Sequence, residues 1–234
     1  MRSFENQLKI FENITCYSVV LDDPTKAGYL IDEALEYLNH YKQPVYIELP
    51  RDIAEKPLRY DVYRQGTPVM SGTDESTMNE ALDETLTWLA SAKKPMILAG
   101  VQVTRFNIEG KLVRFAEKHN IPMATTLLSK STIDEKHPLF AGVYSGPFTT
   151  QDRLREMVDE SDCLLMFGEM MTDLTLGFQS PKFTKRQVVS CSVEGLKIKN
   201  HNYSDVRFTD FCDVLFASDL DKKWGMVVPE KKVS

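Results

Sequence analysis

The feature that most constrains the fold is the apolar run Lys94-Pro95-Met96-Ile97-Leu98-Ala99-Gly100. Opened by a proline and closed by a glycine, it is typical of a strand buried on both faces. A short polar loop and Asn107, a candidate N-cap, follow it, and apolar residues then recur at helical spacing up to Asn120. Residues 121–125 are expected to form the next strand. Strand, helix and strand in this span predict a βαβ unit, which requires a parallel sheet covered by helices.

Composition and charge exclude several classes of function. The chain has 234 residues, enough for one large domain or for one domain of about 150 residues and part of another. Its net charge of −6 argues against nonspecific nucleic-acid binding, which needs a basic face. There is no run of about 18 apolar residues and no signal-peptide core. We therefore expect a cytoplasmic protein without nucleic-acid or membrane partners.

The four cysteines, Cys16, Cys163, Cys191 and Cys212, form no CxxC pair and have no regular local spacing. We interpret them as reduced and mostly buried small apolar residues. Cys191 lies inside an expected strand with no base beside it in the sequence, so it is interpreted as a core residue rather than a nucleophile.

The N-terminal part of the chain predicts an incomplete domain. Asp22-Asp23-Pro24 is a helix-start signal, and the pattern predicts a helix over 25–42 and a strand over 44–49. Residues 17–21 have no clear period, so their structure stays open. One helix and one strand cannot close a core, so residues 1–52 are expected to be the C-terminal part of a larger α/β domain. Residues 53–73 are rich in turn residues and suit a linker.

Residues 74–218 alternate between helical and strand patterns. A helix is expected from Thr73 or Asp74 to the Lys93-Lys94 pair, and further helices from Thr149 or Thr150 and near Phe208. Buried strands are expected at 161–168 and 187–193. This alternation predicts α/β architecture, a doubly wound parallel sheet with helices on both faces. Residues 219–234 are expected to be a tail to a further domain, on which Trp224 could dock.

The order of these segments resembles the thiamine-diphosphate-dependent 2-oxo-acid decarboxylases of the indolepyruvate and pyruvate type. Pro44-Val45-Tyr46-Ile47-Glu48-Leu49-Pro50-x-Asp52 is similar to the end of their pyrimidine-binding domain, and residues 92–100 to the start of their central domain. The similarity continues through Lys130, Glu135-x-His137-Pro138, Gly142-x-Tyr144-x-Gly146, residues 161–168 and residues 171–178. It covers about residues 4–218 and implies a Rossmann-like central domain.

The resemblance also implies a division of labour between domains. It implies thiamine diphosphate and Mg²⁺ as cofactors, a 2-oxo acid as substrate and a homo-oligomer. In the family, an early glutamate of the pyrimidine-binding domain and a Gly-Asp-Gly motif of the C-terminal domain hold the cofactor, and this chain contains no Gly-Asp pair. We therefore expect no catalytic, cofactor-binding or metal-binding residue on this chain. We expect a fragment whose central domain has an architectural role and which is inactive alone.

Several residues allow a functional and a structural interpretation. Gly100 and Gly168 could face a nucleotide or could form tight turns, and we favour turns because no G-x-G-x-x-G follows the first strand. Relatives bind flavin or ADP on this domain, but residues 171–174 lack the arginine expected in the flavin-binding branch, so FAD is not expected. Asp134 and Asp173 are interpreted as helix caps or loop acids.

Two further points complete the sequence-based expectations. His137, which precedes a proline, is interpreted as a loop residue packed beside Phe140, and Trp88 as a helix residue packed on its neighbours. The alternative function is a stand-alone nucleotide-binding or regulatory module with no catalysis. Residues 1–50 favour the decarboxylase fragment, because an isolated helix and strand have no use in an independent module.

Overall fold

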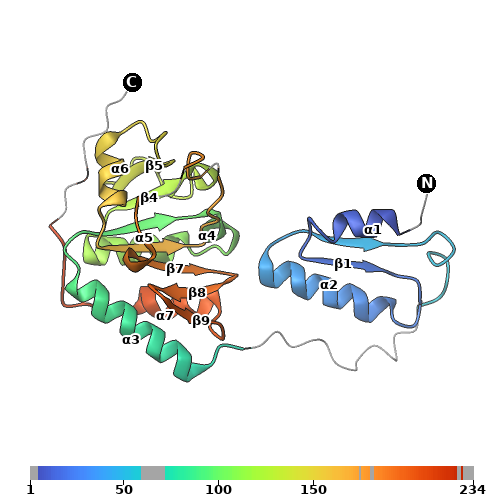
Figure 1. Ribbon diagram of the computed structural model, residues 1–234. Coiled ribbons are helices and arrows are strands. Elements are labelled where there is room, and N and C mark those ends of the chain that lie inside the picture. The colour runs from blue at the N-terminus through green and yellow to red at the C-terminus, as the bar shows by residue number, and fades with distance from the viewer. Residues whose placement is uncertain (1–4, 59–71, 174, 180–181, 226–227, 229–234) are drawn as a thin grey trace. The chain divides into compact units, whose positions relative to one another are not determined.

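The computed structural model describes residues 5–58, 72–173, 175–179, 182–225 and 228. The chain divides into two compact units, Met1–Ser71 and Gly72–Ser234 (Figure 1). Most of the expected linker, residues 59–71, lies outside the described residues. None of the described helices combines the length and the apolar character that crossing a bilayer requires.

The first unit is a small two-stranded parallel sheet with two helices. Its elements are α1 (Asn6–Phe11), β1 (Tyr17–Val20), α2 (Ala27–Tyr41) and β2 (Val45–Glu48). The predicted helix and strand are confirmed as α2 and β2, and the undecided stretch forms β1, with Tyr17 paired to Val45. No residue of either strand is buried. Two half-exposed strands do not make a self-sufficient core.

The second unit contains a seven-stranded sheet in the order β5-β4-β3-β6-β7-β8-β9 (Figure 1). Its strands are β3 (Pro95–Ala99), β4 (Met123–Thr126), β5 (Phe140–Tyr144), β6 (Cys163–Phe167), β7 (Val188–Ser192), β8 (Gly195–Ile198) and β9 (His201–Tyr203). Strands β3 to β7 are parallel, and the chain changes its direction of growth between β3 and β6. This is the doubly wound α/β arrangement that the sequence predicted.

The last two strands add an antiparallel hairpin to the predicted parallel sheet. Strands β8 and β9 are antiparallel to their neighbours. Only Val193 and Glu194 separate β7 from β8, and a parallel connection needs a crossover of a dozen or so residues. The short turn therefore forces a hairpin. Strand β5 was also missed as a strand, because Gly142 in its middle weakens the strand pattern.

The helices of the second unit begin and end largely where local signals place them. They are α3 (Glu75–Ser91), α4 (Val101–Arg105), α5 (Glu109–His119), α6 (Asp152–Asp159) and α7 (Phe208–Ala217), with 3₁₀ turns η2 (Leu127–Ser129) and η3 (Lys185–Gln187). Asp74 is the N-cap of α3 and accepts a hydrogen bond from the backbone of Thr77 at 2.8 Å. Helix α5 ends at Asn120 in the left-handed conformation, as expected.

Two predicted helix caps were wrong. Asn107 has a φ of 54° and joins α4 to α5, so the expected polar loop is itself a short helix. Thr149 accepts a hydrogen bond from the backbone of Ser145 at 2.9 Å, and Gln151 holds the N-cap position of α6. Asn107 thus has the left-handed conformation of a turn, and the side chain of Thr149 bonds a turn next to the helix instead of the first backbone N–H groups of α6.

Each face of the parallel sheet has its own apolar core. Ile97 and Ala99 of β3 belong to the larger cluster with α3, α5 and α7, whereas Met96 and Leu98 belong to the smaller cluster with α6. Strand β3 is completely buried, as the sequence predicted. Beyond β6, on the α6 side of the sheet, Lys197 and Asn202 are exposed, so no described helix covers β8 and β9 there.

The segment that follows α7 is fastened to the second unit. Trp224 is only 5% exposed, and its indole N–H donates to the Ala92 carbonyl at 3.0 Å. Lys222 Nζ donates to the carbonyls of Ala90 and Ala92, and the backbone of Trp224 donates to the carbonyl of His119 at 3.1 Å. The expectation that Trp224 docks on another domain is therefore wrong, because its own domain already buries it.

We expect Trp224→Ala to reduce the free energy of unfolding by about 3–5 kcal/mol, because it leaves a cavity and removes one of the two side-chain hydrogen bonds to the Ala92 carbonyl. Chemical denaturation of the full chain would measure this effect. Phe178→Ala removes an aromatic side chain that is 72% exposed and should change stability by less than about 0.5 kcal/mol. Equal effects of the two substitutions would contradict the role assigned to Trp224.

We expect backbone amides of residues 5–58 to exchange faster than those of residues 95–168, because the first unit has two half-exposed strands and the second a buried seven-stranded sheet. Hydrogen–deuterium exchange with peptide-level mass spectrometry would measure the difference. Equal protection of the two units would show that the first unit packs on a surface that its own elements do not supply.

Candidate functional site

The doubly wound sheet points to one place for a ligand. In open α/β sheets, ligands bind outside the carboxyl ends of the strands at the point where the strand order reverses. Here this point lies between β3 and β6, where Gly100 follows β3 and Gly168 and Glu169 follow β6. These three residues and the turns around them form the candidate site.

The two glycines let the ends of β3 and β6 approach closely. A Cβ atom at Gly100 would overlap the backbone of Gly168 and Glu169, and Gly168 has a φ of 62°. Gly100 N–H donates to the Phe167 carbonyl at 2.8 Å, and Gln102 N–H donates to the Gly168 carbonyl at 3.1 Å. Backbone fills the space that a bound diphosphate would need, so the contacts favour the tight-turn interpretation.

Glu169 is the acid that directly follows Gly168 at this crevice, and sequence analysis did not single it out. Its Oε2 accepts a hydrogen bond from the hydroxyl of Thr126 at 2.9 Å, at the end of β4. Its Oε1 is buried and has no hydrogen-bond partner in the described part of the chain. Burial raises the pKa of Glu169 to about 7, although the hydrogen bond from Thr126 acts in the opposite direction.

The chemistry open to this carboxyl group is limited. With a pKa of about 7 it can accept or donate a proton near neutral pH. The groups that line the hollow beside it include Thr172, Ser190, Ser192, Glu194 and Lys197. None of these is arranged as a nucleophile with a base, so the arrangement is not a catalytic constellation. A signal for Glu169 was available in the sequence, since an acid directly follows the glycine that ends a buried strand.

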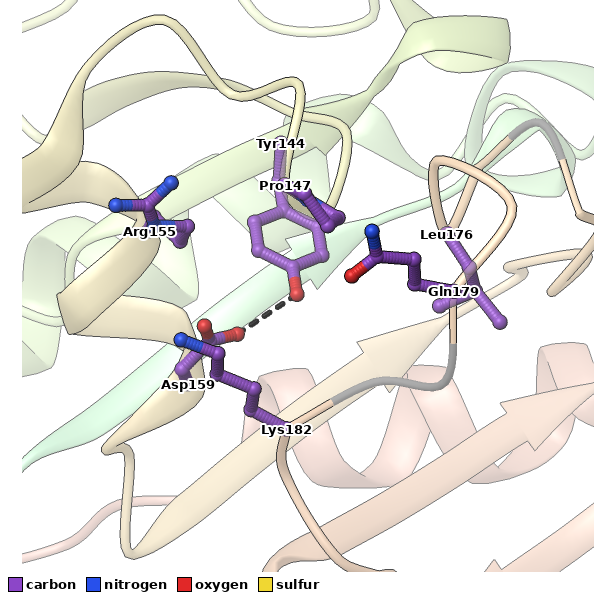
Figure 2. A pocket seen from close by; sticks show the side chains of 8 residues that line it. Tyr144, Pro147, Arg155, Asp159, Leu176, Gln179 and Lys182 are labelled. Carbon is purple, nitrogen blue, oxygen red and sulfur yellow. Dashed lines mark hydrogen bonds between the residues drawn. The ribbon is translucent and has the colours of Figure 1, made fainter.

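A second hollow lies beside β5 and is shown in Figure 2. The hydroxyl of Tyr144 donates to Asp159 on α6 at 2.7 Å, with Arg155, Gln179 and Lys182 around it. The side chain of Tyr144 is 1% exposed, and burial raises the pKa of its hydroxyl group. The hollow has a volume of about 140 Å³. Ligand pockets have about 300–1,000 Å³, so a cofactor of the size of thiamine diphosphate does not fit.

The motif Gly142-x-Tyr144-x-Gly146 has a packing explanation at this hollow. Gly142 and Gly146 have φ values of 133° and 52°, which favour glycine. A Cβ atom at Gly146 would overlap the carbonyl of Leu176, and one at Gly142 would press on Leu154 of α6. The motif therefore packs β5 against its neighbours and positions the hydroxyl of Tyr144.

The remaining candidate residues lie apart from the crevice. Asp134 accepts a hydrogen bond from the backbone of Lys136, which confirms a loop acid. His137 lies in a loop, accepts a hydrogen bond from the backbone of Leu139 and lies 3.1 Å from Glu117. Asp173 is exposed, and its carbonyl accepts a hydrogen bond from Phe178.

The cysteines are free thiols, as predicted. Cys163, Cys191 and Cys212 are buried and Cys16 is half-buried. Burial raises the pKa of Cys163 to about 12, which makes its thiol a poor nucleophile. Cys191 belongs to the larger apolar cluster, in agreement with its interpretation as a core residue.

Neither hollow fits a magnesium ion with a diphosphate. Among the described residues, no group of three or more His, Cys, Asp or Glu side chains is placed to hold a metal. Mg²⁺ needs octahedral oxygen ligands, usually one or two carboxylates beside the phosphates. Glu169 is a single carboxyl group that burial keeps partly protonated. The expectation that this chain holds no site residues stays a prediction.

Comparison with known proteins gives one family and a consistent group of relatives. The family described as "Thiamine pyrophosphate enzyme, central domain" matches residues 82–214, more than half of the chain. Indole-3-pyruvate decarboxylase from Azospirillum brasilense is 25% identical over 92% of this chain and 38% of its own length. A probable pyruvate decarboxylase from Schizosaccharomyces pombe is 28% identical over 98% of this chain and 40% of its own length.

A third relative, pyruvate decarboxylase from Hanseniaspora uvarum, is 26% identical over 88% of this chain and 36% of its own length. The chain therefore spans about two fifths of the length of the curated relatives that it matches. The relatives match nearly the whole chain, whereas the central-domain family begins at residue 82. The similarity thus includes the first unit as well as the second.

We expect Glu169→Gln to flatten the dependence of stability on pH. The pKa of Glu169 is raised from 4.5 to about 7, so the folded state favours the protonated form. Its stabilising effect is complete below pH 4.5 and is lost as the pH rises through about 7. Relative to the variant, the wild-type chain should lose up to about 3 kcal/mol across this window. Urea denaturation at several pH values would measure it.

Glu194→Gln removes an exposed carboxyl group at the same end of the sheet and serves as the matched control. Its pH profile should follow that of the wild-type chain. If the stabilities of the wild-type and Glu169→Gln chains depended on pH in the same way, the carboxyl group of Glu169 would be solvated and its pKa would not be raised.

Proposed function

We propose that this chain, which belongs to the thiamine pyrophosphate enzyme family through its central domain, is part of a decarboxylase of 2-oxo acids. The observation that carries the proposal is the similarity of nearly the whole chain to indolepyruvate and pyruvate decarboxylases. The similarity begins before the central domain, so the order of the two units matches that of the relatives. The activity belongs to the complete protein, which uses thiamine diphosphate and Mg²⁺.

When bound, thiamine diphosphate supplies the electron sink for the loss of carbon dioxide from a 2-oxo acid. The part of this chain in the reaction is architectural. Its second unit has a fully buried central strand and two cores, which make a rigid body on which cofactor-binding domains can be held. The crevice at the strand-order reversal is closed by Gly100 and Gly168, which supports a scaffold in preference to a nucleotide site.

We propose the following domain organisation. Residues 1–52 are the end of a pyrimidine-binding domain, residues 53–73 a linker and residues 74–218 the central domain, with residues 219–234 leading to a C-terminal domain. The buried position of Trp224 supports a central domain that extends at least to that residue. We further propose a cytoplasmic homo-oligomer whose central domain carries no FAD.

The second candidate is a stand-alone nucleotide-binding or regulatory module without catalysis. One observation favours it: the second unit closes its core with its own elements, and Trp224 completes that core. The first unit argues against it, because no residue of its two strands is buried. An independent module gains nothing from such a partial sheet.

We expect the chain by itself not to bind thiamine diphosphate, with or without Mg²⁺, because among the described residues no group of three or more His, Cys, Asp or Glu side chains is placed to hold the metal beside the diphosphate. Isothermal titration calorimetry on the full chain would measure this. Saturable binding in the micromolar range would show that the cofactor site lies on these residues, and the scaffold role would then be abandoned.

The activity itself is tested on the complete polypeptide encoded at this locus. We expect its sequence to supply the activating glutamate and the Gly-Asp-Gly motif, and we expect it to release carbon dioxide from pyruvate or indolepyruvate when thiamine diphosphate and Mg²⁺ are present. A complete polypeptide that carries both motifs and releases no carbon dioxide from either acid would contradict the proposed function.

A further inference from the structure

One part of the sheet surface combines apolar side chains with unpaired positive charge. We call it the lysine face: its floor is Met166, Met171, Phe183 and Val188, and its rim is Lys185, Ser190, Lys197 and Asn202. It lies on β6 to β9, on the α6 side of the sheet and beyond the region that α6 covers. A hollow lined by these residues shows that the surface is open to a partner.

The strand register places three residues of the rim in one line with Met166 across the sheet. Ser190 of β7 pairs with Met166 of β6 and with Lys197 of β8, and Lys197 pairs with Asn202 of β9. Paired residues of neighbouring strands present their side chains on the same face. The row spans three interstrand spacings, roughly 14 Å, which is the length of an extended segment of about four residues.

The lysines of this face differ from three other lysines of their unit, which form ion pairs. Lys94, Lys111 and Lys118 pair with Glu160, Asp213 and Asp219. Lys185 and Lys197 are exposed and have no carboxylate partner in the described part of the chain. In a chain of net charge −6, two unpaired lysines beside an apolar floor form a local positive site.

The chemistry of the rim selects carboxylates. No arginine is among the described residues that line the hollow. The planar guanidinium group, which binds a phosphate through two parallel hydrogen bonds, is therefore absent from this set. Lysine is a mobile point charge, and Asn202 and Asn200 offer amide groups that can bond a peptide backbone. Met166 and Met171 give the floor adaptable apolar side chains, as at surfaces that bind peptides.

We propose that the lysine face is a docking surface for an acidic segment of another polypeptide that carries apolar side chains between its carboxylates. The apolar side chains lie on the methionine and phenylalanine floor, and the carboxylates pair with Lys185 and Lys197. Charge complementarity determines the choice of partner, because Lys185 and Lys197 have no carboxylate partner in the described part of the chain and Met171 offers an exposed apolar side chain. This binding is independent of the decarboxylase function.

The test uses the full chain and a fluorescent synthetic peptide in which glutamates flank a leucine and a phenylalanine. We expect saturable binding by fluorescence anisotropy at low ionic strength, and weaker binding as salt is added. The double variant Lys185→Glu/Lys197→Glu should weaken binding by roughly tenfold or more, because two attractions become repulsions. Lys185→Gln/Lys197→Gln should weaken it to a smaller extent.

The matched control is Lys93→Glu/Lys136→Glu, which makes the same change in net charge at exposed lysines outside the face. It should bind the peptide within about twofold of the wild-type chain. If both charge-reversed variants bound the peptide equally weakly, the effect would be one of net charge alone, and the proposal would be overturned. The absence of saturable binding would also overturn the proposal. Complete displacement of the peptide by inorganic phosphate would overturn it as well, because the site would then bind a small anion.

Discussion

The close approach of β3 and β6 is the contact on which the rest of the second unit depends. Every residue of β3 is buried, and it pairs with β4 on one side and with β6 on the other. At the carboxyl ends of β3 and β6, Gly100 and Gly168 remove the side chains that would keep the two turns apart. The remaining strands are added outward from this pair, and each face of the sheet then acquires its own apolar cluster.

This contact also decides what the crevice at the strand-order reversal can do. In related folds the same place receives a ligand because the first turn leaves room for it. Here the backbone after β6 occupies the space, and Glu169 brings a carboxyl group that burial keeps partly protonated. The closed junction ties β3, β4 and β6 together through Thr126 and Ser129. It agrees with the architectural role that we propose for the second unit.

Sequence reasoning succeeded where a local signal and the tertiary structure agree. The apolar run from Pro95 to Ala99 is a buried strand because nothing else can bury both of its faces. Asp74 caps α3 because its carboxylate can reach the free N–H of Thr77. Sequence reasoning failed where a residue can either cap a helix or form a turn beside it. Asn107 takes the left-handed conformation between two helices, and Thr149 bonds a neighbouring turn. Glu169 was missed although it directly follows the glycine that ends a buried strand, because its shifted pKa arises from burial, which a sequence does not state.

The sequence by itself determined the α/β alternation, the buried central strand and the resemblance to the thiamine pyrophosphate enzymes, since these follow from periodicity and from the order of motifs. Only the tertiary structure decided the antiparallel hairpin of β8 and β9, the burial of Trp224 against Ala92 and the row that places Lys197 beside Ser190 and Asn202. The physical reason is that these features depend on pairing and packing between residues distant in the chain. Local pattern carries no information on which distant residues meet, because that choice is made by the packing of the whole sheet.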